Sequence, residues 1–226
     1  MNESEDPDWV TQWDDVVDVI CVGSNPGVLA YGNACSAADL DVLHIASPAE
    51  FDAETSFYLA AMTEGLDIRT PESEPAVTNA VPAPPRRDAR GRPDVLDPFF
   101  GEQLREWSSV CMASPFAVVF TQVPDQFTRM RSDAGEIITV MTVPDSAEMG
   151  SATDMFAGLI YEEGRLAGAL ITGRSGERRV RAGAGLALPI GPAGQWPRQG
   201  SLALVSRPAG RFARLEVVLE GPGGDD

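Results

Sequence analysis

A short glycine-containing run after an apolar segment is the part of this sequence best suited to binding chemistry. Residues 23–28 read Gly-Ser-Asn-Pro-Gly-Val and follow the apolar run "VVDVICV" at 16–22. Glycine allows a tight turn, and a helix that begins after the turn presents N–H groups and a positive dipole end to phosphate oxygens. The chemistry indicated is the binding of a phosphate-bearing dinucleotide.

The run departs from the fingerprint that such a site requires. The pattern G-x-G-x-x-G asks for glycine at three places, and only Gly23 is in register. Asn25 takes the second place, where asparagine tolerates a left-handed backbone but its side chain occupies space that a pyrophosphate would use. Val28 takes the third place and restricts the approach of the helix to the strand, while Gly27 is one position early.

The acceptor for a ribose is also missing. The position at the end of the second strand, where an acid normally binds the ribose hydroxyls, is Ala46. Asp39 and Asp41 precede that strand and are misplaced for this role. We assign no catalytic residue. The residues expected to line the crevice, whether it is in use or vestigial, are Gly23, Ser24, Asn25, Pro26, Gly27, Ala46 and Ser47.

The elements that position these residues form a βαβ unit. Its expected parts are a strand at 16–22 buried on both faces, a helix at 26–38 with small side chains, and a second strand at 41–46. Downstream we expect helices at 50–63 and 100–113, strands at 116–123 and 135–143, three strands joined by hairpin turns within 157–191, and two more within 201–219. The fold class predicted is α/β, a Rossmann-like FAD-binding-type βαβ core with a parallel sheet plus an antiparallel β-meander.

One domain accounts for most of the chain. Residues 1–15 read as an acidic N-terminal arm that Trp9 and Trp13 could pin to a surface, 16–220 as the single domain, and 221–226 as a polar tail. Within the domain, 70–98 is rich in proline and is expected to be a linker or an extended surface loop.

Composition excludes several classes of function. The formal net charge is −17, all 17 bases are arginine, and so acidic a chain is unsuited to nucleic acid. No apolar run is long enough to span a membrane and no signal pattern opens the chain, so a cytoplasmic location is expected. Cys21, Cys35 and Cys111 lack metal-ligand spacing and are expected to fill the core, and His44 is expected to be a strand residue. No metal site is predicted.

Four segments in order resemble FAD-dependent oxidoreductases of the fumarate reductase and 3-ketosteroid dehydrogenase flavoprotein group. The segments are "DVICVGSNPG" at 18–27, "DVLHIAS" at 41–47, "YEEGRLAGALI" at 161–171 and "LALPIGP" at 186–192. They are similar to the family patterns "DVVVVGSGPAG", "VLVLEK", "EDGRVVGV" and "VLATGG". The family also carries a substrate-capping domain with the catalytic residues, for which this chain is too short.

The resemblance and its departures imply two alternatives. The first is a degenerate, truncated FAD-binding-type domain that has no cofactor, is non-catalytic alone and serves as an accessory subunit for a protein partner, for example a complete flavoenzyme subunit. The second is a small FAD-dependent oxidoreductase or nucleotide-binding flavoprotein component, in which Gly23, Ser24, Asn25 and Gly27 would carry the phosphate.

Overall fold

The computed structural model describes residues 11–67, 74–82, 101–121, 130–132, 135–142, 153–190, 201–207 and 210–219. Its helices are α1 (Pro26–Ala37), α2 (Ala53–Thr63) and α3 (Glu102–Met112). Its strands are β1 (Asp15–Val22), β2 (Val42–Ile45), β3 (Ala76–Asn79), β4 (Val81–Pro82), β5 (Val118–Phe120), β6 (Met130–Arg131), β7 (Glu136–Thr142), β8 (Met155–Glu162), β9 (Arg165–Gly173), β10 (Gly176–Pro189), β11 (Ser201–Ser206) and β12 (Phe212–Leu219).

The first three elements form the parallel unit that the sequence predicts. β1 and β2 pair in parallel from Val19 opposite Val42 to Val22 opposite Ile45, and α1 connects them. The residues of β1 from Val19 to Val22 are fully buried, so this strand is covered on both faces as expected. On its other side β1 pairs in parallel with β10.

Beyond this point the sheet is mostly antiparallel. Its order is β2-β1-β10-β5-β12-β11-β7-β6-β4, with β9 and β8 attached to β10 and β3 attached to β12. The predicted meander is confirmed, since β8, β9 and β10 follow one another through turns at 163–164 and 174–175. Short turns force antiparallel pairing, because a parallel neighbour needs a crossover of a dozen residues or more. In its described residues the molecule is therefore a mixed α/β protein with a strand-rich sheet and few helices, and the predicted Rossmann-like core with a parallel sheet is not confirmed.

The sheet curls, so that the segments at its two ends form backbone contacts with strands further along the sheet. After β2, the Ala46 N–H donates to the Asp154 carbonyl at 2.8 Å, and the Phe156 N–H donates to the Ala46 carbonyl at 2.9 Å, which joins β2 to β8. At the other end β3 pairs with β12 while β4, two residues further on, pairs with β6. Both curls cover strand edges that would otherwise present unpaired backbone groups. Segments 76–79 and 81–82 of the proline-rich stretch are thus strands.

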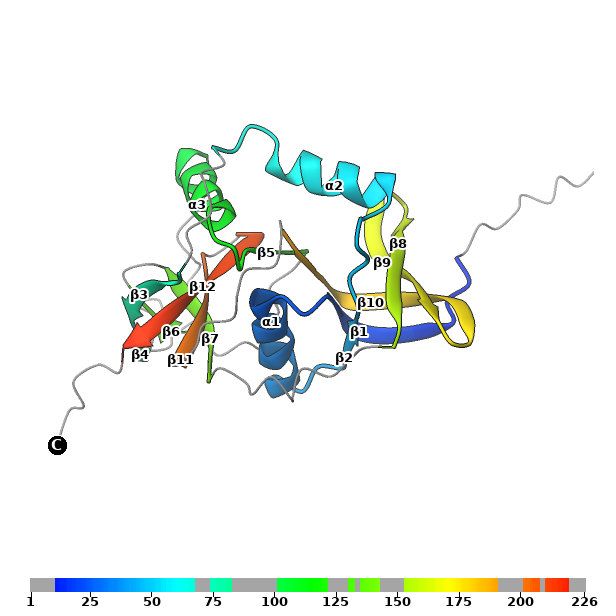
Figure 1. Cartoon of the computed structure of the whole chain (residues 1–226), viewed down its shortest axis with the longest axis horizontal. Helices are drawn as coiled ribbons and strands as arrows, with labels where there is room; N and C mark the ends of the chain where they lie inside the picture. The colour runs from blue at the N-terminus through cyan, green and yellow to red at the C-terminus, as the bar shows by residue number, and fades with distance from the viewer. Residues whose placement is uncertain are drawn as a thin grey trace, which may run out of the picture.

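Two layers of helix cover the sheet. α1 lies on one face and α2 and α3 lie on the opposite face (Figure 1). α1 packs so deeply that eight of its residues are buried, and its Tyr31 ring stacks on Phe120 with centroids 5.1 Å apart. α2 packs through Tyr58, Leu59 and Met62 and buries only Thr55 fully. None of the helices in the described ranges has the length and apolar run needed to span a bilayer.

Candidate functional site

The turn after β1 keeps the first glycine of the fingerprint for a physical reason. Gly23 has a φ of +88°, and its N–H donates to the Ile45 carbonyl at 2.7 Å, which ties the turn to β2. A Cβ at this position would lie 3.1 Å from the Ser47 Cβ. Both the backbone angle and the close approach of Ser47 therefore require glycine here.

Asn25 has a different role from the one that the sequence suggested. Its φ is −59°, so it does not use the left-handed conformation, and Gly23 alone supplies the positive angle. Asn25 is the N-cap of α1: its Oδ1 accepts the Gly27 N–H at 2.8 Å, and its Nδ2 donates to the Pro115 carbonyl at 3.3 Å. The side chain is only 3% exposed and occupies the end of the helix where a phosphate would be held.

The first turn of α1 offers no accessible N–H group to a ligand. Pro26 has no N–H, the Gly27 N–H is used by Asn25, and Val28 is fully buried. The backbone carbonyl of Phe116 lies directly against Gly27, in the space that a Cβ would take. The connection from α3 to β5, residues 113–117, thus covers the N-terminal end of α1.

Val28 is compatible with a close helix. It is fully buried in the cluster that α1 forms with the sheet, together with Val19 and Cys21 of β1. The glycine that permits close approach is instead Gly32, where a Cβ would lie 2.7 Å from His44 Nε2 and 3.2 Å from Cys21 Sγ. His44 lies in β2 as expected and is partly exposed, and partial desolvation of its ring lowers its pKa because the charged form loses hydration.

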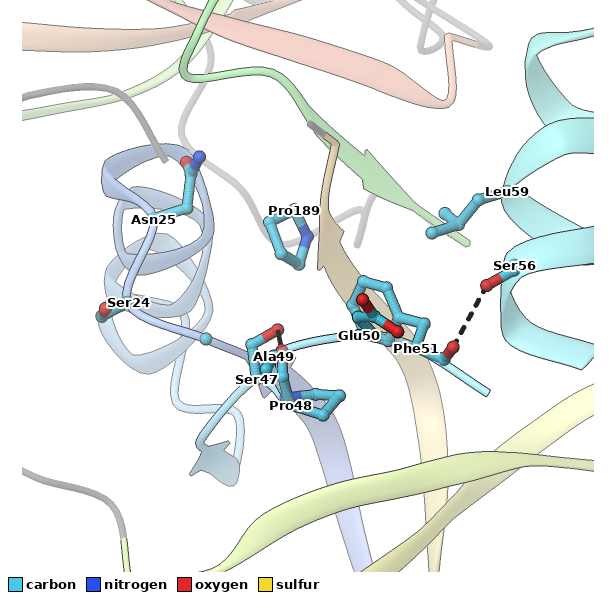
Figure 2. A pocket seen from close by; sticks show the side chains of 11 residues that line it. Ser24, Asn25, Ser47, Pro48, Ala49, Glu50, Phe51, Ser56, Leu59 and Pro189 are labelled. Carbon is cyan, nitrogen blue, oxygen red and sulfur yellow. Dashed lines mark hydrogen bonds between the residues drawn. The ribbon is translucent and has the colours of Figure 1, made fainter. Parts of the chain in front are cut away.

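A hollow of about 650 Å³ lies next to the Gly23 turn, beyond the carboxyl ends of β1 and β2. This is the place where ligands bind in open α/β sheets. Of the predicted crevice residues, Gly23, Ser24, Asn25 and Ser47 line it, whereas Pro26, Gly27 and Ala46 do not. Its other lining residues, which sequence reasoning missed, are Pro48, Ala49, Glu50, Phe51, Ser56, Leu59 and Pro189 (Figure 2).

The lining of this hollow is acidic and apolar. Among the described residues that line it, Glu50 is the only ionisable side chain and none is an arginine. Ser47 Oγ donates to the Pro48 carbonyl at 3.3 Å, and Ser56 Oγ donates to the Phe51 carbonyl at 3.3 Å. Ala46 has both backbone groups engaged with β8, and its methyl group accepts no hydrogen bond. The lining that the structure describes therefore favours a neutral or cationic group and supplies no cation for a phosphate.

The N-cap of α2 lies beside the hollow. The Asp52 carboxylate accepts the N–H groups of Glu54 at 2.9 Å and Thr55 at 3.0 Å, and the Thr55 hydroxyl at 2.5 Å. Desolvation alone would raise the pKa of Asp52, but the hydrogen bonds from Thr55 and Glu54 outweigh it and lower the pKa below its usual value.

The cysteines fill the core as predicted. Cys21, Cys35 and Cys111 are all fully buried and unbridged. Burial raises the pKa of the Cys35 thiol to about 12 and that of the Cys111 thiol further, so neither supplies a thiolate at neutral pH. Among the residues described, no group of three or more His, Cys, Asp or Glu side chains is placed to hold a metal ion.

A buried ion pair beneath α3 also escaped sequence reasoning. Arg214 Nε lies 3.4 Å from Glu216 Oε1, with the side chains 6% and 4% exposed, and Arg214 donates to the Val110 carbonyl at 3.2 Å. Both residues belong to β12, and they lie two apart on one face of that strand. This pair attaches α3 to the sheet and lies away from the hollow, so it is structural.

No family model, curated protein or solved structure matches this chain.

Proposed function

We propose that this protein is a non-catalytic accessory domain built on a degenerate FAD-binding-type βαβ unit, which acts by binding another protein. The resemblance to the fumarate reductase and 3-ketosteroid dehydrogenase flavoproteins motivates the first part. The observation that carries the proposal is the covered N-terminus of α1, where Asn25, Pro115 and Phe116 occupy the place of a pyrophosphate.

The cost of admitting a dinucleotide follows from these contacts. A phosphate oxygen at the α1 terminus would have to displace the Asn25 carboxamide from the Gly27 N–H and move the backbone at Phe116. Removing a buried hydrogen-bond partner costs about 1–3 kcal/mol for each group left unpaired. Glu50 in the adjacent hollow adds like-charge repulsion, and none of the lining residues within the described ranges is an arginine that could offset it.

The outer face of α2 supports a protein partner. Phe57 is 76% exposed, and it is followed at helical spacing by the exposed Ala60 and Ala61. Glu54 and Glu64 flank this apolar stripe at its two ends, and α2 lies at the outer edge of the molecule in Figure 1. An apolar stripe between two acids is complementary to an amphipathic helix that has basic residues at its ends. The partner class we propose is such a basic amphipathic helix, for example on a complete flavoenzyme subunit.

The alternative is a small flavoprotein component that holds FAD through the Gly23 turn. The position of the hollow beyond the ends of β1 and β2 favours it. The two alternatives differ in a simple property, since the flavoprotein is yellow when purified and the accessory domain is colourless.

Thermal unfolding with added cofactors tests the closed site. FAD or NAD at 100 times its dissociation constant would stabilise the chain by about 2.7 kcal/mol. We expect no shift of the melting temperature with either cofactor up to millimolar concentration. A saturable rise would contradict the proposal and favour the flavoprotein alternative.

Binding of a synthetic peptide tests the partner surface. The probe is a helical peptide of leucine and lysine, with a glutamate-for-lysine peptide of the same hydrophobic pattern as its control. We expect the basic peptide to bind, Phe57→Ala to weaken it at least tenfold, and added salt to weaken it further. Equal binding of the acidic peptide, or no effect of Phe57→Ala, would contradict the assignment of this surface.

A further inference from the structure

We infer that the hollow beside the Gly23 turn is a binding site for a small molecule that carries a protonated amine next to an apolar group. The hollow has a volume of about 650 Å³, within the range of about 300–1,000 Å³ typical of small-molecule sites. This inference goes beyond the proposed accessory role and does not depend on the partner surface, which is on the outer side of α2.

The apolar part of the ligand has a defined wall to contact. Pro189 lies at the end of β10, Leu59 projects from α2, and Phe51 packs edge-to-face on Phe156 with ring centroids 5.6 Å apart. Figure 2 shows Pro189 and Leu59 on opposite sides of the space. Phe51 is held by its aromatic partner, so this wall exists before a ligand arrives and costs little ordering on binding.

The charged part of the ligand is selected by Glu50. Glu50 lines the hollow as an exposed residue whose carboxylate is drawn over the Phe51 ring in Figure 2, and within the described residues it has neither a hydrogen bond nor an ion pair. An ammonium group placed there gains a charge-assisted hydrogen bond with the carboxylate. The chain as a whole, with a net charge of −17, raises the local concentration of cations.

Hydroxyl groups complete the polar surround. Ser24 and Ser47 come from the two turns that follow β1 and β2, and Ser56 comes from α2. Serine hydroxyls accept as well as donate, so Ser47 and Ser56 can take the remaining ammonium protons, whereas the Ser24 hydroxyl is directed away from Glu50 in Figure 2. The same set gives an anion no positive partner, because Pro26 lacks an N–H and the Gly27 N–H is already bonded to Asn25.

Three small molecules of similar size distinguish the contribution of charge to binding from that of apolar contact. They are 2-phenylethylamine, 2-phenylethanol and 3-phenylpropionate, titrated into the full chain at pH 7 and followed by ligand-observed NMR and calorimetry. We expect the amine to bind at least tenfold more tightly than the propionate, with the alcohol between them. Equal affinity of the three probes, or binding of none, would overturn the inference.

Variants then assign the selectivity. Glu50→Gln should reduce amine affinity about tenfold, to the level of the alcohol, and leave the alcohol unchanged. Glu54→Gln is the matched control, because Glu54 is a nearby exposed acid that does not line the hollow. Leu59→Ala should weaken the amine and the alcohol equally. If Glu50→Gln leaves amine binding intact, the assignment of Glu50 is wrong, whatever the outcome with FAD or the peptide.

Discussion

Helices α1 and α2 have similar apolar compositions and opposite surroundings. Both are apolar around most of their circumference, yet α1 buries eight of its twelve residues and α2 buries one of its eleven. The sheet wraps α1, whereas α2 contacts the core only through its inner side. A mostly apolar helix is normally buried, so the exposed outer side of α2 is the surface that we propose for a protein partner.

The two aromatic residues of these helices give the largest expected contrast. Tyr31 in α1 is fully buried against Phe120, and Phe57 in α2 is 76% exposed. Tyr31→Ala should lower the free energy of unfolding by about 3–5 kcal/mol, in line with large aromatic truncations in cores. Phe57→Ala should change it by less than about 0.5 kcal/mol. Urea unfolding of the two variants measures both values, and a large loss for Phe57→Ala would show that α2 is more deeply packed than described.

The second-largest loss of stability is expected at the N-terminal end of α1, which residues 113–117 cover. Gly27→Ala places a methyl group against the Phe116 carbonyl, which is backbone and cannot rotate away. We expect a loss of about 1–3 kcal/mol, as for other overpacked sites. The control is Gly183→Ala in β10, where the nearest atom, the Val17 carbonyl oxygen, would be 3.7 Å from the new Cβ. Equal stability of the two variants would indicate that residues 113–117 do not cover the helix.

The cap of α1 gives a smaller change. Asn25→Ala removes both the bond to Gly27 and the bond to Pro115, and we expect a cost of about 1–2 kcal/mol. Ser24→Ala is the neighbouring control, because Ser24 is exposed. Chemical denaturation of both variants makes this comparison, and a neutral Asn25→Ala would contradict the capping role.

The smallest expected effect is a difference in pH dependence between the N-cap of α2, which titrates, and the N-cap of α1, which does not. Asp52, the cap of α2, has a folded-state pKa below its usual value of 3.8, so its ionised form is favoured by folding. The stabilisation from this group is present above pH 3.8 and is lost as the pH falls through the folded pKa. The amide cap of α1 does not titrate. Asp52→Asn should therefore flatten this part of the stability profile between about pH 5 and 2, measured by thermal unfolding, while a profile unchanged by Asp52→Asn would exclude the effect.

Local patterns in the sequence predicted the elements well. The apolar run Val19–Val22 of β1, the small residues of α1 and the hairpin turns at 163–164 and 174–175 are each set by neighbouring residues, so local sequence patterns identified them. The pairing of β1 with β10 joins strands more than 150 residues apart. No local signal reports such a pairing, and the parallel sheet was therefore predicted too broadly.

The residues of the site were also predicted only in part. Gly23 was identified because its turn needs a positive φ, and Ser47 because it follows β2. The contact of Asn25 with Pro115 spans 90 residues, so local patterns predicted the obstruction at Asn25 but not the segment that completes it. Glu50, which lies in the loop before α2, was expected to be the first residue of a helix and not part of a binding site.

The most direct test follows the Gly27 amide by NMR while FAD is added. We expect a slowly exchanging Gly27 N–H, because it is buried and bonded to Asn25, and no shift of this signal or that of Val28 at millimolar FAD. Saturable shifts of both signals with FAD would contradict it, since they would place the dinucleotide at the end of α1.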